Sequence, residues 1–244
     1  MEVSVEEGLL RLAVHLKGVA PLPLTYREGL QAALYALLPR ELRGKVHNEG
    51  FPVGGKSLKY FVFSRILGLR LERKTFYPDS SLRFFLASPL PGLIATWARA
   101  LQERGELLLY GKAFPVLLVE PLPLPPLGHR LVVQTLSPVT AYRTLENGKT
   151  RYFRPDEPEF SALLEANLNR KAVGLGLPPG RLEVKALPGT RDGMETYKGF
   201  WVLGWKGRFL LQGDPWLIRL ALLTGLGPKG SQGFGFVREA GAAD

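Results

Sequence analysis

A proline-dense run near the middle of the chain, Pro121-Leu122-Pro123-Leu124-Pro125-Pro126, limits the folds open to this sequence more than any other feature. So many prolines resist both helix and central strand, which indicates an extended and rather stiff connector. We therefore predict a linker at residues 121–128, a first domain over residues 1–120 and a second domain over residues 129–244.

The two halves follow the same order of elements. In the first half, Thr25-Tyr26-Arg27-Glu28 has the pattern of a capping box that opens a helix ending at Pro39, and a second helix is expected at 91–104. Strict alternation at residues 9–17 predicts a half-buried strand whose outer face is basic, with Arg11, His15 and Lys17. The other strands of this half are expected at 58–65, 82–88 and 106–119.

In the second half, Asn147-Gly148 predicts a small hairpin, because this pair favours a tight primed turn. Helices are expected at 158–171 and 215–224, and strands at 130–136, 181–187, 197–211 with a break near Gly204, and 234–238. Two consecutive β-α-β-β-α-β units predict an α+β protein with two tandem ferredoxin-like domains. RNA-binding sheets use this fold, but so do many unrelated functions.

The charge balance favours a polyanionic partner. The 244 residues carry a formal net charge of +10 and a sequence pI of about 9.9, and nucleic acid is the commonest partner of such a surplus. A protein that is basic for no functional reason is the alternative. Cysteine is absent, which fits a cytoplasmic location, and no apolar run is long enough for a membrane span.

The segment from Gly225 to Val237 holds five glycines and a lysine between a helix-like and a strand-like run. The spacing Gly225-x-Gly227-x-x-Gly230 matches the dinucleotide fingerprint, but that fingerprint follows a strand and opens a helix, and here the order is reversed. Converging glycine amides make an anion cradle, so the segment could hold a polyanion backbone. The candidate contacts are Gly225, Gly227, Lys229, Gly230, Ser231, Gly233, Phe234 and Gly235.

Three other residues could carry chemistry. His47 lies in a polar segment after the first helix, Tyr35 lies off the apolar stripe of that helix, and Lys59 begins a strand. We predict neither a metal nor another cofactor, because the chain has no Cys and no His pair at ligand spacing. A metal-independent ribonuclease needs a histidine, a second proton donor or acceptor, and a cation. An exposed histidine without a role is the alternative for His47.

With these residues in place, the chain resembles the CRISPR-associated endoribonucleases that cut precursor CRISPR RNA within its repeats, the sixth Cas protein. Three segments carry the resemblance: residues 30–38 with His47 and Lys59-Tyr60-Phe61-Val62-Phe63-Ser64, then Gln134-Thr135-Leu136-Ser137-Pro138-Val139, then the glycine-rich segment ending in Gly233-Phe234-Gly235. The family implies tandem ferredoxin-like domains and metal-independent cleavage that leaves a 2′,3′-cyclic phosphate and a 5′-hydroxyl.

The resemblance also implies roles and partners. Tyr35 would orient or deprotonate the 2′-hydroxyl, His47 would be general acid or base, and Lys59 would stabilise the scissile phosphate, with Lys56 as its rival. Lys56 and Arg65 are further candidate RNA contacts, and the glycine-rich segment would seat RNA or pack the helix beneath it. Expected partners are CRISPR repeat RNA, other subunits of a CRISPR effector complex and a second copy of the chain, with no membrane partner.

Two other functions remain open from the sequence. One is a non-catalytic RNA-binding subunit of a ribonucleoprotein, in which Tyr35, His47 and Lys59 would be ordinary surface residues. The other is a small-molecule enzyme on a ferredoxin-like fold, which would have a deep apolar pocket and no affinity for RNA.

Overall fold

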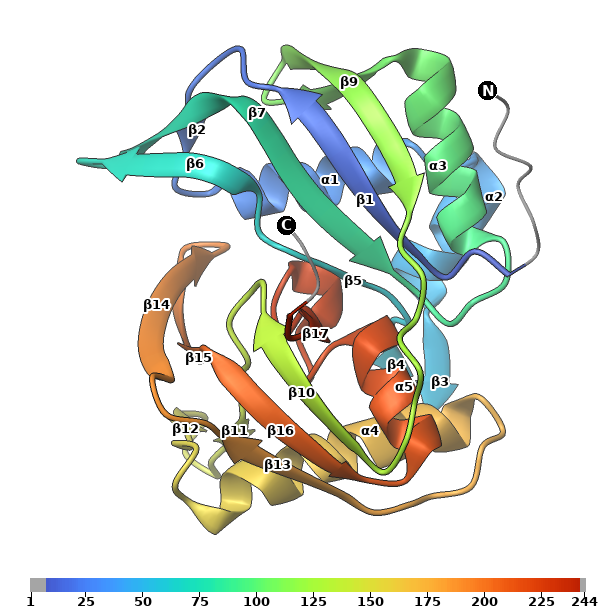
Figure 1. The fold of residues 1–244 in the computed structure, drawn as a ribbon, viewed down its shortest axis with the longest axis vertical. Coiled ribbons are helices and arrows are strands. Elements are labelled where there is room, and N and C mark those ends of the chain that lie inside the picture. The colour runs from blue at the N-terminus through green and yellow to red at the C-terminus, as the bar shows by residue number, and fades with distance from the viewer. Residues whose placement is uncertain (1–7, 242–244) are drawn as a thin grey trace.

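The computed structural model describes residues 8–241, except for the side chains of residues 47–49 and 56. Two sheets with their helices lie one above the other, and residues 122–129, which contain no helix or strand, run from one to the other (Figure 1). None of the helices in the described part has the length and apolar character that a membrane span requires.

The first domain is an antiparallel sheet in the order β2-β7-β1-β9-β8, with β5 and β6 also paired to β7. Helices α1 and α3 cover one face of this sheet through Leu30, Leu34 and Trp97, which are fully buried. The strands are β1 (Arg11–Lys17), β2 (Leu22–Pro23), β5 (Val62–Phe63), β6 (Leu67–Glu72), β7 (Thr75–Ala87), β8 (Glu106–Leu109) and β9 (Lys112–Pro121), and the helices are α1 (Tyr26–Ala36) and α3 (Leu93–Arg104).

The second domain has the sheet order β13-β16-β10-β17, again with two covering helices. Its elements are β10 (Arg130–Thr135), α4 (Pro158–Gly174), β13 (Leu182–Ala186), β16 (Arg208–Gly213), α5 (Pro215–Thr224) and β17 (Val237–Glu239). Two hairpins are added, β11 (Tyr142–Thr144) with β12 (Thr150–Tyr152), and β14 (Arg191–Tyr197) with β15 (Phe200–Lys206). In both sheets the first strand of the unit is central and the two helices share a face, so the predicted tandem ferredoxin-like fold is confirmed.

Three local predictions were wrong. The expected break near Gly204 falls at Gly207, whose φ of 145° lets β15 pass directly into β16 beside Thr190. The strand expected at 58–65 is two short pieces, β4 (Lys56–Leu58), which pairs with β3 (Phe51–Val53), and β5. Thr25 does begin α1, but its side chain makes no capping hydrogen bond.

The basic outer face predicted for the first strand is wrong at its N-terminal end. Arg11 is 1% exposed, and its guanidinium donates to Pro123 O at 3.0 Å and pairs with Glu239 at 3.1 Å. The same face of the sheet buries Ala13 against apolar residues of the second domain. This face is therefore the contact between the two domains rather than a solvated surface.

Helix α1 makes a second contact between the domains through its polar side. Arg27 is 2% exposed, donates to Gly233 O, pairs with Glu195 on β14 and lies over the Phe234 ring at 4.5 Å. Glu28 accepts a hydrogen bond from Lys198 N at 2.5 Å. One turn of α1 is thus attached to both the glycine-rich segment and the β14–β15 hairpin.

We expect the Arg27→Ala variant to lose about 3 kcal/mol of unfolding free energy, because removing one partner of a buried ion pair leaves the opposite charge without compensation. The loss lies at the low end of the usual range because Glu195 keeps Lys206, 2.7 Å away, as a partner. Urea unfolding measures it, with Arg99→Ala on the exposed side of α3 as the control. Equal midpoints for the two variants would contradict the bridging role of Arg27.

A buried lysine fixes the beginning of the glycine-rich segment. The Nζ of Lys171, on α4, donates to the carbonyls of Thr224 at 3.2 Å, Gly225 at 3.4 Å and Gly227 at 3.1 Å. These carbonyls belong to the last residue of α5 and to the residues just after it, where a helix carries partial negative charge and a cation is favourable. Burial nevertheless lowers the pKa of Lys171 to about 7.

This lysine makes stability depend on pH. The unfolded chain keeps the Lys171 proton up to a pKa of 10.5, while the folded chain releases it near 7. Between these values the unfolded state binds more protons, so the unfolding free energy rises with pH. Urea unfolding at pH 7, 8, 9 and 10 should show a steeper rise for wild type than for Lys171→Met. Parallel curves would show that Lys171 stays charged in the folded protein.

Candidate functional site

The chain after α1 stays helical where a polar loop was expected. Helix α2 (Arg40–Arg43) continues into a π-helical turn, η1 (Gly44–Glu49), which includes the backbone of His47. The side chain of His47 lies outside the described residues. The turn ends at Gly50, with φ 59°, where an added Cβ would lie 2.9 Å from Leu58 O. The end of the turn therefore packs against the residue that precedes Lys59.

Tyr35 and Lys59 lie together at the C-terminal half of α1. Tyr35 is 6% exposed, with its ring edge-to-face against Phe61 at 5.7 Å, and Lys59 Nζ is 5.6 Å from its ring centroid. Burial, with a smaller effect of Tyr197, raises the pKa of the Tyr35 hydroxyl. Tyr35 is thus buried although it was expected to lie off the apolar stripe of α1, and at neutral pH its hydroxyl is a hydrogen-bond donor.

The second domain contributes to the same place through the tip of the β14–β15 hairpin. Tyr197 donates a hydrogen bond to Gln31 Oε1 at 2.6 Å, and Gln31 Nε2 donates to Ser231 O at 2.5 Å. Lys198 is near enough to Lys59 that, together with the larger effect of burial, it lowers the pKa of Lys59. We call Gln31, Tyr35, Lys59, Tyr197 and Lys198 the junction cluster.

The glycines of the glycine-rich segment are buried between the domains. An added Cβ at Gly230 would lie 2.6 Å from Thr224 O, and at Gly233, with φ 82°, it would lie 2.5 Å from the Phe63 ring. Gly225, Gly227, Gly235 and Phe234 are buried as well. This burial favours the alternative in which the segment packs the helix beside it, over direct contact of these residues with RNA. Ser231 is partly exposed and reaches the junction cluster through its carbonyl.

The remaining predicted RNA contacts lie elsewhere. Lys229 is half-buried, with its Nζ 5.0 Å from the centroid of the Tyr142 ring on β11 of the second domain. Arg65 is exposed and lines a separate hollow beside β10. The side chain of Lys56 lies outside the described residues. The structure thus brings together Tyr35, Lys59 and Ser231, and separates Arg65 and Lys229 from them.

The junction cluster has the groups that phosphate chemistry uses. Two ammonium groups, Lys59 and Lys198, lie where they repel one another, and a bound phosphate would relieve this repulsion. Tyr35 and Tyr197 add hydroxyl groups with raised pKa values, which favour the protonated, donating form. Such an arrangement can bind a phosphodiester and stabilise negative charge that develops on it.

Tyr197 and Lys198 were not among the predicted site residues. The pair Lys198-Gly199, with φ values of 48° and 78°, forms the tight turn of the hairpin, and this dipeptide is a recognisable turn signal. The turn was recoverable from the sequence, but its position against α1 was not, because that depends on packing between segments some 170 residues apart.

Comparison with known proteins agrees with this architecture. Residues 122–239 match the family described as "CRISPR associated protein Cas6, C-terminal". The CRISPR-associated endoribonuclease Cas6 of Pyrococcus furiosus (strain ATCC 43587 / DSM 3638 / JCM 8422 / Vc1) is 25% identical over 160 residues, which are 65% of this chain and 60% of that relative.

Solved structures share the fold over nearly the whole chain. A Cas6-related protein from Pyrococcus furiosus superposes with a TM-score of 0.81 at 17% identity, covering 96% of this chain and 99% of its own. A RAMP protein described as binding different RNA substrates has a TM-score of 0.78 at 20% identity, covering 94% of this chain and 99% of its own. Residues 122–239 thus match the C-terminal part of Cas6 in sequence, and both halves of the chain share the fold of these solved structures.

Proposed function

We propose that this protein is an endoribonuclease that cleaves precursor CRISPR RNA within its repeats without a metal ion. The match of residues 122–239 to the Cas6 C-terminal family and the naming of the Pyrococcus furiosus relative as an endoribonuclease support the class of activity. The observation that carries the proposal is the junction cluster, in which both domains place cations and hydroxyls beside a π-helical turn. Turns of this kind are frequent at functional sites.

The proposed reaction is an internal transfer at phosphorus. The 2′-hydroxyl oxygen forms a bond to the adjacent phosphorus while the bond from phosphorus to the 5′-oxygen of the next nucleotide breaks. The 2′-hydroxyl gives up its proton to a base, and the leaving 5′-oxygen takes one from an acid. The products are a 2′,3′-cyclic phosphate and a 5′-hydroxyl, and no water is consumed in this step.

Each candidate residue has a role that suits its chemistry. His47 is the general acid or base, because imidazole exchanges protons near neutral pH. Lys59 stabilises the charge of the scissile phosphate, a role for which Lys56 is the alternative. Tyr35 orients the 2′-hydroxyl by a hydrogen bond, since its raised pKa disfavours the phenolate that a base would need.

The partner in this proposal is CRISPR repeat RNA in the cytoplasm, and the net charge of +10 supports a polyanionic ligand. Association with other CRISPR subunits and with a second copy of the chain remain predictions. A non-catalytic RNA-binding subunit is the competing function, and it gives the opposite result in the cleavage experiment that follows.

The first test is single-turnover cleavage of a labelled CRISPR repeat RNA from the source genome in buffer with EDTA. We expect wild type to cut it and His47→Ala to be slower by about 10²–10⁴-fold, the usual contribution of an acid–base group. His129→Ala, which removes an exposed histidine of the second domain, should cut at the wild-type rate.

Equal rates for wild type and His47→Ala would show that the site is wrongly assigned. RNA that wild type binds tightly but leaves intact for hours would instead support the non-catalytic subunit.

The second test is the pH dependence of cleavage. The folded pKa of Lys59 lies below its ordinary 10.5, because burial and Lys198 disfavour its charge. If the charged form is required, activity is full at neutral pH and declines as pH rises through this lowered pKa. Lys59→Arg should move that decline to higher pH, since arginine stays protonated. Single-turnover rates from pH 6 to 9.5 measure it, and an unshifted decline would remove Lys59 from this role.

A further inference from the structure

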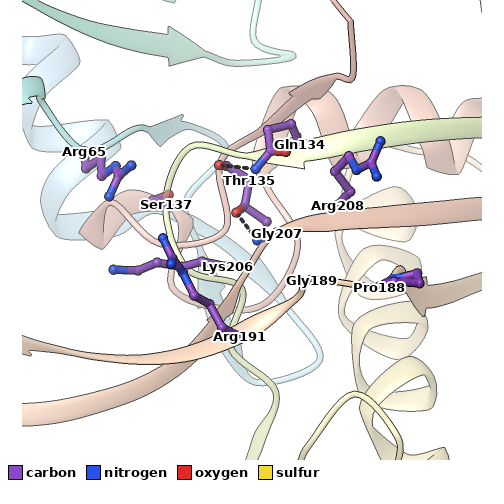
Figure 2. A pocket seen from close by; sticks show the side chains of 10 residues that line it. All are labelled: Arg65, Gln134, Thr135, Ser137, Pro188, Gly189, Arg191, Lys206, Gly207 and Arg208. Atoms are coloured by element: carbon purple, nitrogen blue, oxygen red, sulfur yellow. Dashed lines mark hydrogen bonds between the residues drawn. The ribbon is translucent and has the colours of Figure 1, made fainter.

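The hollow that Arg65 lines beside β10 has a volume of about 260 Å³ and lies between the end of β10 and the base of the β14–β15 hairpin. Its cationic lining comes from both domains, with Arg65 from the first and Arg191, Lys206 and Arg208 from the second. Figure 2 shows Arg65, Arg191 and Lys206 gathered on one side of Thr135 and Gly207, with Arg208 on the other side. None of Arg191, Lys206 and Arg208 was among the predicted site residues.

Most of the positive charge in this hollow has no carboxylate partner among the residues that the structure describes. Within the described part of the chain, no ion pair joins Arg65, Arg191 or Arg208 to a carboxylate. Lys206 does pair with Glu195 at 2.7 Å, but Glu195 also pairs with the buried Arg27. Burial first, and then Arg65, Arg27 and Arg191, lower the pKa of Lys206 to about 8. The positive charges therefore repel one another where an anion would stabilise all of them.

The floor of the hollow is held by hydrogen bonds between neighbouring segments and has a free hydroxyl donor. Thr135 N donates to Gly207 O at 2.9 Å, and Gly207 N donates to Thr135 Oγ1 at 2.9 Å. Ser137 Oγ accepts from Phe236 N at 2.8 Å, which leaves its hydroxyl hydrogen to donate. The hollow thus combines a hydroxyl donor with several cations, and phosphate oxygens accept strong hydrogen bonds from such groups.

A larger groove of about 740 Å³ adjoins this hollow and shares Arg65 and Lys206 with it. It lies between β6 of the first domain and the β14–β15 hairpin, and Trp201 and Met194 in its wall are 59% and 58% exposed. Arg73 and Lys74 also line it. An exposed indole beside cations suits a nucleobase attached to a phosphate, because bases stack on aromatic side chains whatever their sequence.

We propose that the hollow binds a backbone phosphate of a single-stranded RNA segment and that the neighbouring base stacks on Trp201 in the groove. This proposal rests on the proposed function, since it assigns a path to the RNA that the junction cluster would cut. Arg191 is at the base of the hairpin and Lys198 at its tip, seven positions along, which spans about 20 Å of strand. The phosphate site and the junction cluster thus lie at opposite ends of the β14–β15 hairpin.

The experiment measures binding of a decauridylate RNA and of a repeat RNA that carries 2′-deoxyribose at the cleaved nucleotide, over a range of salt concentrations. Arg191→Ala/Arg208→Ala should lower the slope of log K against log salt by about 0.7, because the hollow holds one backbone phosphate and each lost phosphate contact on a single strand removes about 0.7. Arg99→Ala/Arg104→Ala, which removes the same charge from the exposed side of α3, should keep the wild-type slope.

Stacking of a base on Trp201 is tested with separate variants. Trp201→Ala should weaken binding of decauridylate by roughly fivefold or more, and Trp201→Phe should restore most of it, since a phenyl ring still stacks. Slopes that are equal for the two double variants would overturn the phosphate site, and unchanged affinity of Trp201→Ala would overturn the stacking site.

The binding readout separates this proposal from the proposed function. An RNA that binds with the expected salt slopes but is never cleaved overturns the endoribonuclease and keeps the phosphate site. Normal cleavage with unchanged salt slopes overturns the phosphate site alone. Thermal unfolding of each variant identifies any loss that comes from misfolding, and Arg191→Gln/Arg208→Gln repeats the test if the alanine variant unfolds.

Discussion

The guanidinium group of Arg27 holds together the three segments on which the candidate site depends. It lies in α1, donates to the glycine-rich segment at Gly233, and pairs with Glu195 on the β14–β15 hairpin. A guanidinium suits this position because it offers five donors in a fixed plane and remains charged when buried. Together with the hydrogen bonds from Lys198 N to Glu28 and from Tyr197 to Gln31, it fixes the helix that carries Tyr35 against the hairpin that carries Tyr197 and Lys198.

This constraint gives the glycine-rich segment a structural explanation. Its glycines allow the backbone to pass between α5 and the first domain at distances that no side chain tolerates, as at Gly230 and Gly233. Lys171 then holds the beginning of the segment through three carbonyls. The segment therefore acts chiefly by fixing α1 and the β14–β15 hairpin relative to one another. The groups of the junction cluster that can meet RNA are its cations.

Those cations follow a common pattern. Lys59 lies near Lys198, and Lys206 lies near Arg65 and Arg191, so like charges approach one another in two places along one hairpin. Such repulsion lowers stability in the free protein and is relieved when phosphates bind.

The sequence predicted the order of elements, the tandem fold and the helix that carries Tyr35, because these depend on local periodicity and on Gly and Pro. It did not predict the burial of Arg11 and Arg27, because their carboxylate partners, Glu239 and Glu195, belong to the other domain. Tyr197, Lys198 and Arg191 were missed for the same reason. Their place beside first-domain residues follows from long-range packing, which one sequence without relatives does not reveal.

If both domains supply the groups around the scissile phosphate, a crystal structure with an uncleavable repeat RNA will show those groups on one nucleotide. We expect a phosphodiester about 3 Å from Lys59 Nζ, with Tyr35 and the hairpin residue Lys198 beside the same nucleotide. Repeat RNA bound in one position with its cleavage point distant from α1 and from the tip of the β14–β15 hairpin would contradict it.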